Sequence, residues 1–248
     1  MNSERITQAT AALEGQTVVI FGGTSGIGLS TAIQAKAIGA HVIVIGSDAA
    51  RAERAALDNK LDGWRAADVT KPEAIATALA DIPSVDHLIL LAGTFVAGTV
   101  MDSEISYLRR AFEERIWASI HAIRTLGDRL SKNGSITFIS GSLADRPNAY
   151  GTAVLAAASA AMEALARGLA LELAPIRVNT LSPGPINTPI LAKALGDARD
   201  GFVASLEAQL PLHRLGTATE AGAAATFLMT NTFMNGATLN IDGGARLV

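Results

Sequence analysis

The feature that most constrains this chain is a glycine-rich turn between a short apolar run and a helical stretch. Residues 18–21 (VVIF) form the apolar run, residues 22–28 (GGTSGIG) form the turn, and the helical stretch continues to about Ile38. Gly39 then ends the helix, and residues 41–45 (HVIVI) predict a second strand. A strand, a turn, a helix and a strand within roughly 30 residues make a βαβ unit, which builds a parallel sheet.

The same alternation continues along the chain. Further helices are expected at about 48–61, from Pro72 onward, and at 107–112, 117–130, 152–174 and 219–230; further strands are expected at 64–67, 86–91, 135–140, 177–181 and 237–241. Seven strands alternating with helices predict an α/β fold of the Rossmann type, a doubly wound parallel sheet with helices on both faces. No linker or repeat divides residues 1–248, so we expect one domain. We expect residues 185–215, which are rich in Pro and Gly and start as a loop with short helices, to form a substrate lid.

Composition and charge exclude several classes of function. The formal net charge of −3 gives no electrostatic case for binding nucleic acid or an anionic membrane. The chain has no cysteine, which excludes disulfides and thiolate metal sites, and its four histidines lack a metal-ligand spacing. No stretch is expected to reach the roughly 20 apolar residues that span a bilayer, and residues 1–14 lack the apolar core of a signal peptide. We therefore expect a soluble, cytoplasmic protein without a metal.

The glycine-rich turn is suited to hold a pyrophosphate. Glycine is required where the backbone turns tightly and comes close to the phosphates, and the last glycine of the turn lets the helix approach the sheet. Backbone N–H groups at the start of the helix attract the anion, and the hydroxyls of Thr24 and Ser25 are further donors. The turn therefore predicts a dinucleotide-binding protein.

The spacing Gly22-xxx-Gly26-x-Gly28 resembles that of the short-chain dehydrogenase/reductase family, and other landmarks of the family follow in order. Residues 68–69 (DV) resemble its adenine-contacting pair, and residues 90–93 (LLAG) resemble its Asn-Asn-Ala-Gly motif with both asparagines replaced. Residues 177–188 (RVNTLSPGPINT) resemble its nicotinamide loop, and residues 240–244 (NIDGG) its closing strand.

This resemblance implies a nicotinamide dinucleotide cofactor and a homodimer or homotetramer formed through long helices such as 152–174. Thr188 matches the threonine that touches the nicotinamide carboxamide. The cofactor-binding residues implied by the resemblance are Gly22, Thr24, Ser25, Gly26, Ile27, Gly28, Asp68, Val69, Leu91, Ala92, Gly93, Pro183, Gly184, Ile186 and Thr188.

The end of the second strand bears on the choice of cofactor. Members that bind NAD place an acidic residue there to accept hydrogen bonds from the ribose diol, whereas this chain has Gly46-Ser47. Ser47 and Arg51 are available to bind a 2′-phosphate, which favours NADP over NAD. Asp48 would oppose a phosphate if it turned inward; alternatively it caps the following helix.

The family's catalytic residues are largely absent. The resemblance places a serine, a tyrosine, a lysine four residues later and an asparagine in the active site. Ser142 matches the serine, but Leu155 stands at the tyrosine, Ser159 at the lysine and Arg115 at the asparagine. No lysine occurs between Lys132 and Lys193, so no shift of register restores a Tyr-xxx-Lys pair.

Replacement catalytic groups are expected among Arg115, Ser142, Asp145, Arg146 and Tyr150. Arg115 could stabilise an oxyanion or hold a substrate carboxylate, or it could pair with the neighbouring glutamates. Asp145 could act as an acid if a dry pocket raised its pKa, or, like Arg146, lie in a solvated turn. Tyr150 could point into the cleft or serve packing, and Ser142 could be a retained hydroxyl without a partner.

These features predict an NADP-dependent oxidoreductase with a non-standard active site. A small apolar carbonyl, imine or activated alkene is the expected substrate, because the lid carries Leu191, Leu195, Phe202, Val203 and Leu206. His213, near the lid, is a further candidate for the pocket wall. One alternative is a dinucleotide-binding protein without redox turnover, acting as a sensor or scaffold. Another is an enzyme that uses the same pocket for non-redox chemistry.

Overall fold

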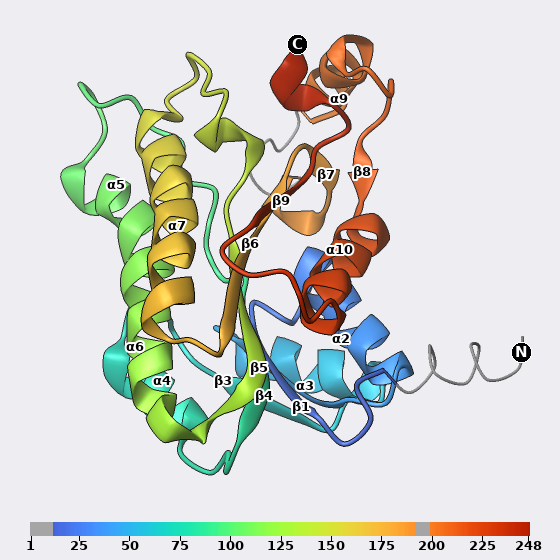
Figure 1. The fold of residues 1–248 in the computed structure, drawn as a ribbon. Coiled ribbons are helices and arrows are strands. Elements are labelled where there is room, and N and C mark those ends of the chain that lie inside the picture. The colour runs from blue at the N-terminus through green and yellow to red at the C-terminus, as the bar shows by residue number, and fades with distance from the viewer. Residues whose placement is uncertain (1–11, 192–198) are drawn as a thin grey trace, which may run out of the picture.

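Seven parallel strands form the central sheet of the computed structural model, which describes residues 12–191 and 199–248 (Figure 1). Their order is β3-β2-β1-β4-β5-β6-β9, and every neighbouring pair is parallel. The strands are β1 (Thr17–Phe21), β2 (His41–Gly46), β3 (Gly63–Ala66), β4 (Val85–Leu90), β5 (Leu130–Ile139), β6 (Arg177–Pro183) and β9 (Thr238–Ile241). The order reverses between β1 and β4, as in a doubly wound sheet, so the fold expected from the sequence is confirmed.

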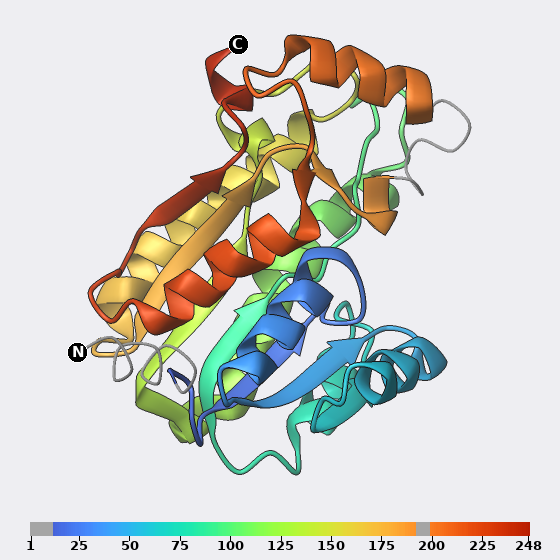
Figure 2. The ribbon, with the colours of Figure 1, turned by 90° about the vertical axis from the view of Figure 1, so that its right-hand side faces the viewer.

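Helices cover both faces of the sheet. One face carries α2 (Gly26–Ala37), α3 (Ala49–Asp58) and α10 (Ala218–Thr230); the other carries α4 (Pro72–Leu79), α6 (Ala118–Leu126) and α7 (Ala153–Glu172). Figure 1 shows the two layers on either side of the sheet, and Figure 2 shows α10 lying beside α2. Residues 18–21 of β1 are at most 1% exposed because they are covered from both sides, which explains their uninterrupted apolar sequence.

The predicted bounds of the helix at 117–130 are wrong at both ends. The structure shows α5 (Ile105–Phe112) continuing through a π-helical turn, η1 (Glu113–Trp117), into α6, so residues 113–116 do not interrupt the helix. The helix ends at Leu126 because Gly127 adopts a φ of 50° and turns the chain into the longer strand β5.

The expected lid region contains more regular structure than its sequence suggests. A short helix, α9 (Arg199–Gln209), lies there, and β7 (Ile186–Asn187) pairs with β8 (Gly216–Thr217). Phe202, Val203 and Leu206 are half-buried on α9. Leu195 lies outside the described residues.

Helix α7 is long and apolar enough, by length and composition, to cross a membrane, contrary to the expectation that no stretch is. Its inward side chains Met162, Ala166 and Ala170 belong to the main core beneath the sheet. Strand β6 runs alongside it (Figure 1). The apolar composition of α7 therefore includes a face that the fold buries against the sheet.

His87 lies buried in β4 and makes stability depend on pH. Its Nε2 is 2.7 Å from Oε1 of Gln16 and its Nδ1 is 2.7 Å from Oγ of Ser135, a pairing that suits a neutral ring. Burial, together with the charge of Arg177, lowers the pKa of His87 from 6.5 to about 4. As pH falls from 6.5 toward 4, the unfolded chain takes up a proton at His87 that the folded chain does not bind, so stability decreases.

We expect this histidine to remove about 3 kcal/mol of unfolding free energy between pH 7 and pH 4. Urea denaturation at several pH values measures the slope of the unfolding free energy against pH. His87→Gln should flatten it, although the variant is less stable at pH 7. His213→Asn is the control, because His213 is exposed and its φ of 50° suits asparagine. An unchanged slope in His87→Gln would contradict the role of burial.

Candidate functional site

The glycine-rich turn folds tightly over the carboxyl end of β1. Gly22 has a φ of 80°, and a Cβ placed on it would lie 2.9 Å from the backbone nitrogen of Ala92. A Cβ on Gly28 would lie well inside contact distance of the carbonyl oxygen of Gly22. Both positions therefore require glycine. In the described structure Ser25, the first residue before α2, makes no side-chain hydrogen bond to the helix, which leaves the N–H groups of the first turn available to an anion.

The end of β2 lies beside this turn. A Cβ on Gly46 would be 2.6 Å from Cγ2 of Thr24, so the Thr24 side chain occupies the space above Gly46. Asp48 accepts a hydrogen bond of 2.7 Å from the backbone N–H of Arg51 and caps α3. Its carboxylate is thus engaged by the helix, while Ser47 and Arg51 are exposed at the same helix end.

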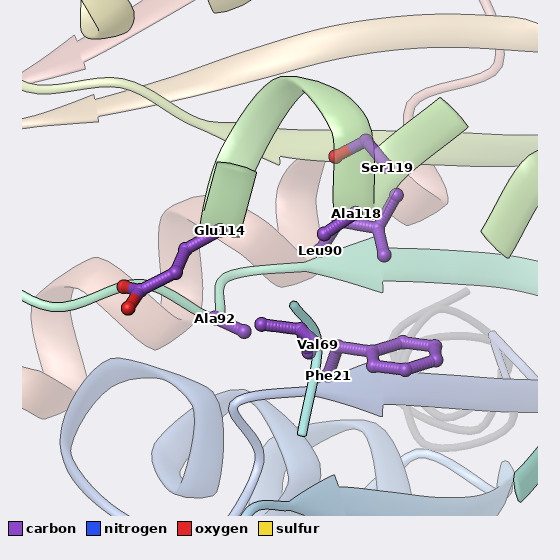
Figure 3. Close-up of a pocket in the computed structure, with 7 residues that line it drawn as sticks. All are labelled: Phe21, Val69, Leu90, Ala92, Glu114, Ala118 and Ser119. Atoms are coloured by element: carbon purple, nitrogen blue, oxygen red, sulfur yellow. The ribbon is translucent and has the colours of Figure 1, made fainter. Parts of the chain in front are cut away.

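The residues expected to contact adenine lie between β3 and α4. Asp68 accepts hydrogen bonds from the backbone N–H of Thr70 (2.9 Å) and from its hydroxyl (2.8 Å), and these bonds hold the pKa of Asp68 below its usual value. Next to it, Val69 borders two hollows. A small cavity of about 10 Å³ is lined by Phe21, Val69, Leu90, Ala92, Glu114, Ala118 and Ser119 (Figure 3). A groove of about 400 Å³ lies between Val69 and η1–α6.

The segment expected to contact nicotinamide follows β6. Gly184 donates a 3.0 Å hydrogen bond to the carbonyl of Ile241, and Ile186 is buried in β7. Pro183 ends β6. A Cβ on Gly26 would lie 3.3 Å from Cβ of Thr188, so the structure brings Thr188 against the glycine-rich turn from a distant part of the sequence.

The loop after β5 carries Ser142, which is half-buried at the start of a short 3-10 turn, η3 (Ser142–Ala144). Leu155 and Ser159, at the positions of the family's tyrosine and lysine, are only 3% and 4% exposed and face the protein interior on α7. The hydroxyl of Ser140 donates to the carbonyl of Ser159 (3.1 Å) and to Oε1 of Glu163 (2.7 Å).

The remaining candidates of this loop lie at the surface. Asp145, Arg146 and Tyr150 are exposed, Tyr150 by 79%. Asp145 therefore lacks the dry pocket that an acid role would require. His213 is also exposed, which does not favour a place in the pocket wall.

Arg115 projects from η1 toward the loop that follows β4. The neighbouring glutamates pair with other arginines, Glu113 with Arg109 (3.5 Å) and Glu114 with Arg110 (2.7 Å). The salt bridges of the described residues do not include Arg115, so the expected alternative of a helix-surface ion pair is wrong. Instead Arg115 donates from Nη2 to the carbonyl of Thr94 (3.0 Å) and, more weakly, from Nη1 to that of Ala111 (3.4 Å).

The guanidinium of Arg115 lies directly against Gly93. A Cβ on Gly93 would be 3.0 Å from its Cζ. Burial lowers the pKa of Arg115, with a smaller opposing effect from Glu114, but an arginine remains charged at neutral pH. Because β4 pairs with β5 in register, Leu90 with Phe138, the loops that carry Gly93 and Ser142 leave adjacent strand ends. The site therefore presents a cation that has no salt bridge among the described residues, against a loop that leaves the sheet next to the one that carries Ser142.

Two charged side chains of this region are absent from the residues that the sequence singles out. Glu114 is 4% exposed and binds Thr94, and Glu163 binds Ser140. Neither lies in a motif. Glu114 belongs to a polar helical stretch, where a carboxylate is normally solvated, so the sequence carries no signal for it. Glu163 is a lone carboxylate in the middle of the apolar helix α7, and that isolation is the signal that could have identified it. Within the described residues, no group of three or more His, Asp or Glu side chains could hold a metal ion.

Comparisons with known proteins agree over nearly the whole length of the chain. A family model described as enoyl-(acyl carrier protein) reductase matches residues 22–246. The short-chain dehydrogenase/reductase ATR9 of Stachybotrys chlorohalonatus is 34% identical, over 95% of this chain and 98% of that protein. A solved small-chain dehydrogenase in complex with NADPH is 33% identical, with a TM-score of 0.81 and coverage of 94% and 99%. The cyclic-di-GMP-binding biofilm dispersal mediator protein of Escherichia coli is 30% identical, over 94% of this chain and 98% of that protein.

Proposed function

The chain belongs to the short-chain dehydrogenase/reductase family and is an oxidoreductase of that type, and from this premise we propose that it uses NADPH to reduce a small, apolar, activated alkene. The observation that carries the proposal is the Arg115 guanidinium, which has no salt bridge among the described residues and lies against Gly93, in the loop after β4; that loop leaves the sheet next to the strand end that leads to Ser142. A leucine meanwhile occupies the position of the usual proton donor.

The chain's own residues fit a dinucleotide. A Cβ would fill the space at Gly22 and Gly28, and the uncapped start of α2 offers N–H groups to a pyrophosphate. The bound cofactor supplies the hydride. Thr188 would contact the nicotinamide end and Asp68 and Val69 the adenine end; the position of Thr188 against Gly26 supports the first of these contacts.

Arg115 distinguishes between the possible acceptors. Hydride addition to a ketone gives an alkoxide that needs a proton, and Arg115 is a poor proton donor because, although burial lowers its pKa, a guanidinium stays charged at neutral pH. Hydride addition to an alkene conjugated to a carbonyl places the negative charge on the carbonyl oxygen, where a guanidinium stabilises it without transferring a proton. Water then protonates the carbon. An iminium ion is already cationic and is repelled by Arg115.

Ser47 and Arg51 support NADPH as the cofactor. Both are exposed at the end of β2, and Asp48 is turned into the cap of α3 rather than toward a phosphate. The solved relative in complex with NADPH shows that a protein of this fold and of one-third identity accepts that cofactor. A guanidinium and a helix N-terminus together favour a 2′-phosphate.

We expect NADPH to bind at least tenfold more tightly than NADH in a calorimetric titration. Arg51→Ala should weaken NADPH binding about tenfold and leave NADH binding unchanged, because only NADPH carries the 2′-phosphate. Arg54→Ala is the matched control, since Arg54 is an exposed arginine of the same helix, three residues further from its N-terminus. Equal affinity for the two cofactors would overturn the preference. Failure of both to bind at millimolar concentration would exclude the oxidoreductase.

Turnover tests the acceptor. With saturating NADPH, the absorbance of NADPH should fall as small cyclic enones are reduced, and should fall far more slowly with the matching saturated ketones and cyclic imines.

A second candidate function, nucleotide binding without redox turnover, is favoured by the buried Leu155 and Ser159 at the catalytic positions and by the name of the E. coli relative. Tight cofactor binding without turnover on any of the three acceptor classes would favour that second function.

A further inference from the structure

The π-helical turn η1 directs two consecutive side chains to one loop residue. Glu114 Oε2 accepts hydrogen bonds from the backbone N–H (2.6 Å) and the hydroxyl (2.8 Å) of Thr94, while Arg115 donates to the carbonyl of Thr94 (3.0 Å). Every polar group of Thr94 is therefore bound by Glu114 or Arg115. π-Helical turns inside helices are rare, and those that occur are often found at functional sites.

Glu114 is the fixed member of this arrangement. Its carboxylate is 4% exposed, and its other oxygen, Oε1, accepts from Nε of Arg110 (2.9 Å) and pairs with Nη2 (2.7 Å). A buried carboxylate is strongly unfavourable unless donors surround it, and here donors from Thr94 and Arg110 engage both oxygens. Figure 3 shows the side chain reaching from the helix toward the loop that continues from Ala92.

The loop held by Glu114 in turn holds Arg115. Thr94 is itself at the surface, so little else restrains its peptide groups. Its carbonyl is the closer of the two acceptors of Arg115, and the guanidinium rests on the preceding residue, Gly93. If the Thr94 backbone moved, both the acceptor and the surface under the guanidinium would move with it.

We propose that Glu114 is a positioning residue that fixes Arg115 in the active site through Thr94. This inference rests on the proposed function, in which Arg115 stabilises negative charge on the reacting substrate. Glu114 forms its salt bridge with Arg110 and none with Arg115, and its charge has only the smaller of the two effects on the pKa of Arg115. Rigid placement matters because a charge displaced by about 1 Å stabilises a transition state far less well.

The test compares Glu114→Gln with Glu113→Gln. Both changes replace one helix carboxylate by an amide of the same shape, but among the described residues the salt bridge of Glu113 is with the exposed Arg109. With NADPH and a cyclic enone, we expect Glu114→Gln to lower kcat at least tenfold and to change the Kd of NADPH less than twofold. Glu113→Gln should stay within twofold of the wild type in both measurements.

A double-mutant cycle separates positioning from a merely structural role. Because Glu114 acts through Arg115, Glu114→Gln should cost less than twofold in kcat when Arg115 is already Met. A full tenfold cost in the Arg115→Met background would overturn the proposal, and so would an unchanged kcat in Glu114→Gln alone. If Glu114→Gln does not fold, Thr94→Val and Thr94→Ser decide in its place: Val should lower kcat, and Ser, which restores the hydroxyl, should recover most of the loss.

A readout without turnover keeps the two proposals distinguishable. Side-chain ¹⁵N relaxation of the Arg115 guanidinium should show an immobilised group in the wild type and a mobile one in Glu114→Gln. Equal mobility in the two proteins would overturn the positioning role even if the enzyme is active. A wild type that turns over no acceptor but shows this difference would overturn the proposed reaction and retain the positioning of Arg115 by Glu114.

Discussion

Replacing Gly28 with alanine is expected to abolish binding of NADPH. The added Cβ would collide with the carbonyl oxygen of Gly22, and both atoms belong to backbone that cannot move aside without opening the turn. Opening the turn withdraws the N–H groups that hold the pyrophosphate, so we expect a loss of affinity of at least 100-fold, about 2.7 kcal/mol. Calorimetry or quenching of NADPH fluorescence measures it.

Gly168→Ala is the matched control for this change. Gly168 lies in α7, and a Cβ there would have no heavy atom within 4 Å among its neighbours. Alanine in a helix interior is favoured over glycine by roughly 0.5–1 kcal/mol, so this variant should be more stable and should bind NADPH normally. Wild-type affinity in Gly28→Ala would show that the first turn of α2 does not form the phosphate site.

Replacing Arg177 with methionine is expected to be the most destabilising of the changes considered. The side chain is 7% exposed and donates to four backbone carbonyls around the end of α10, those of Leu228 (2.8 Å), Met229 (2.7 Å), Asn231 (2.9 Å) and Met234 (3.4 Å). Carbonyls at the end of a helix lack partners within the helix, and a cation there also interacts favourably with the negative end of the helix dipole.

Methionine retains the apolar part of this side chain but leaves buried carbonyls unsatisfied. We expect a loss of about 3–5 kcal/mol in unfolding free energy, measured by urea denaturation at pH 7. Arg124→Met, at an exposed position in the last turn of α6, should change stability by no more than about 0.5 kcal/mol. Equal losses in the two variants would refute the role of Arg177 as the cap of α10.

Much of the fold was predictable because the apolar pattern and the glycines specify it locally. Residues 18–21 are apolar at every position, as in a strand covered on both faces, and the glycine-rich residues that follow form a turn until α2 begins at Gly26. The end of α6 was not predictable from periodicity, since the apolar pattern continues to Leu130. Gly127 ends the helix after Leu126 through a backbone conformation that other residues rarely adopt.

The sequence singled out residues of the candidate site but could not show which way their side chains point. The sequence left two interpretations of Asp48 open, a helix cap or a side chain turned toward the cofactor, and the 2.7 Å bond from the Arg51 N–H shows the cap. Glu114 and Arg115 are consecutive, and in an α-helix consecutive side chains point about 100° apart. Both side chains reach Thr94 from a π-helical turn, which has no signature in the local sequence.

Strand order determines how this sheet can be assembled as the chain is synthesised. On one side β1, β2 and β3 pair in chain order, and on the other β4, β5 and β6 do the same. Each half can form from segments that are near in sequence, which keeps the entropic cost of closing loops small, and the amino-terminal half can form first. Joining the halves at β1 and β4 is then the step of longest range, and the one we expect to be slow.

The glycine-rich turn lies where these two halves of the sheet meet. Gly22 leaves β1 and lies against Leu91 and Ala92, which leave β4. A dinucleotide bound at this turn would contact both halves of the sheet. We therefore expect its binding to require that β1 and β4 have already paired.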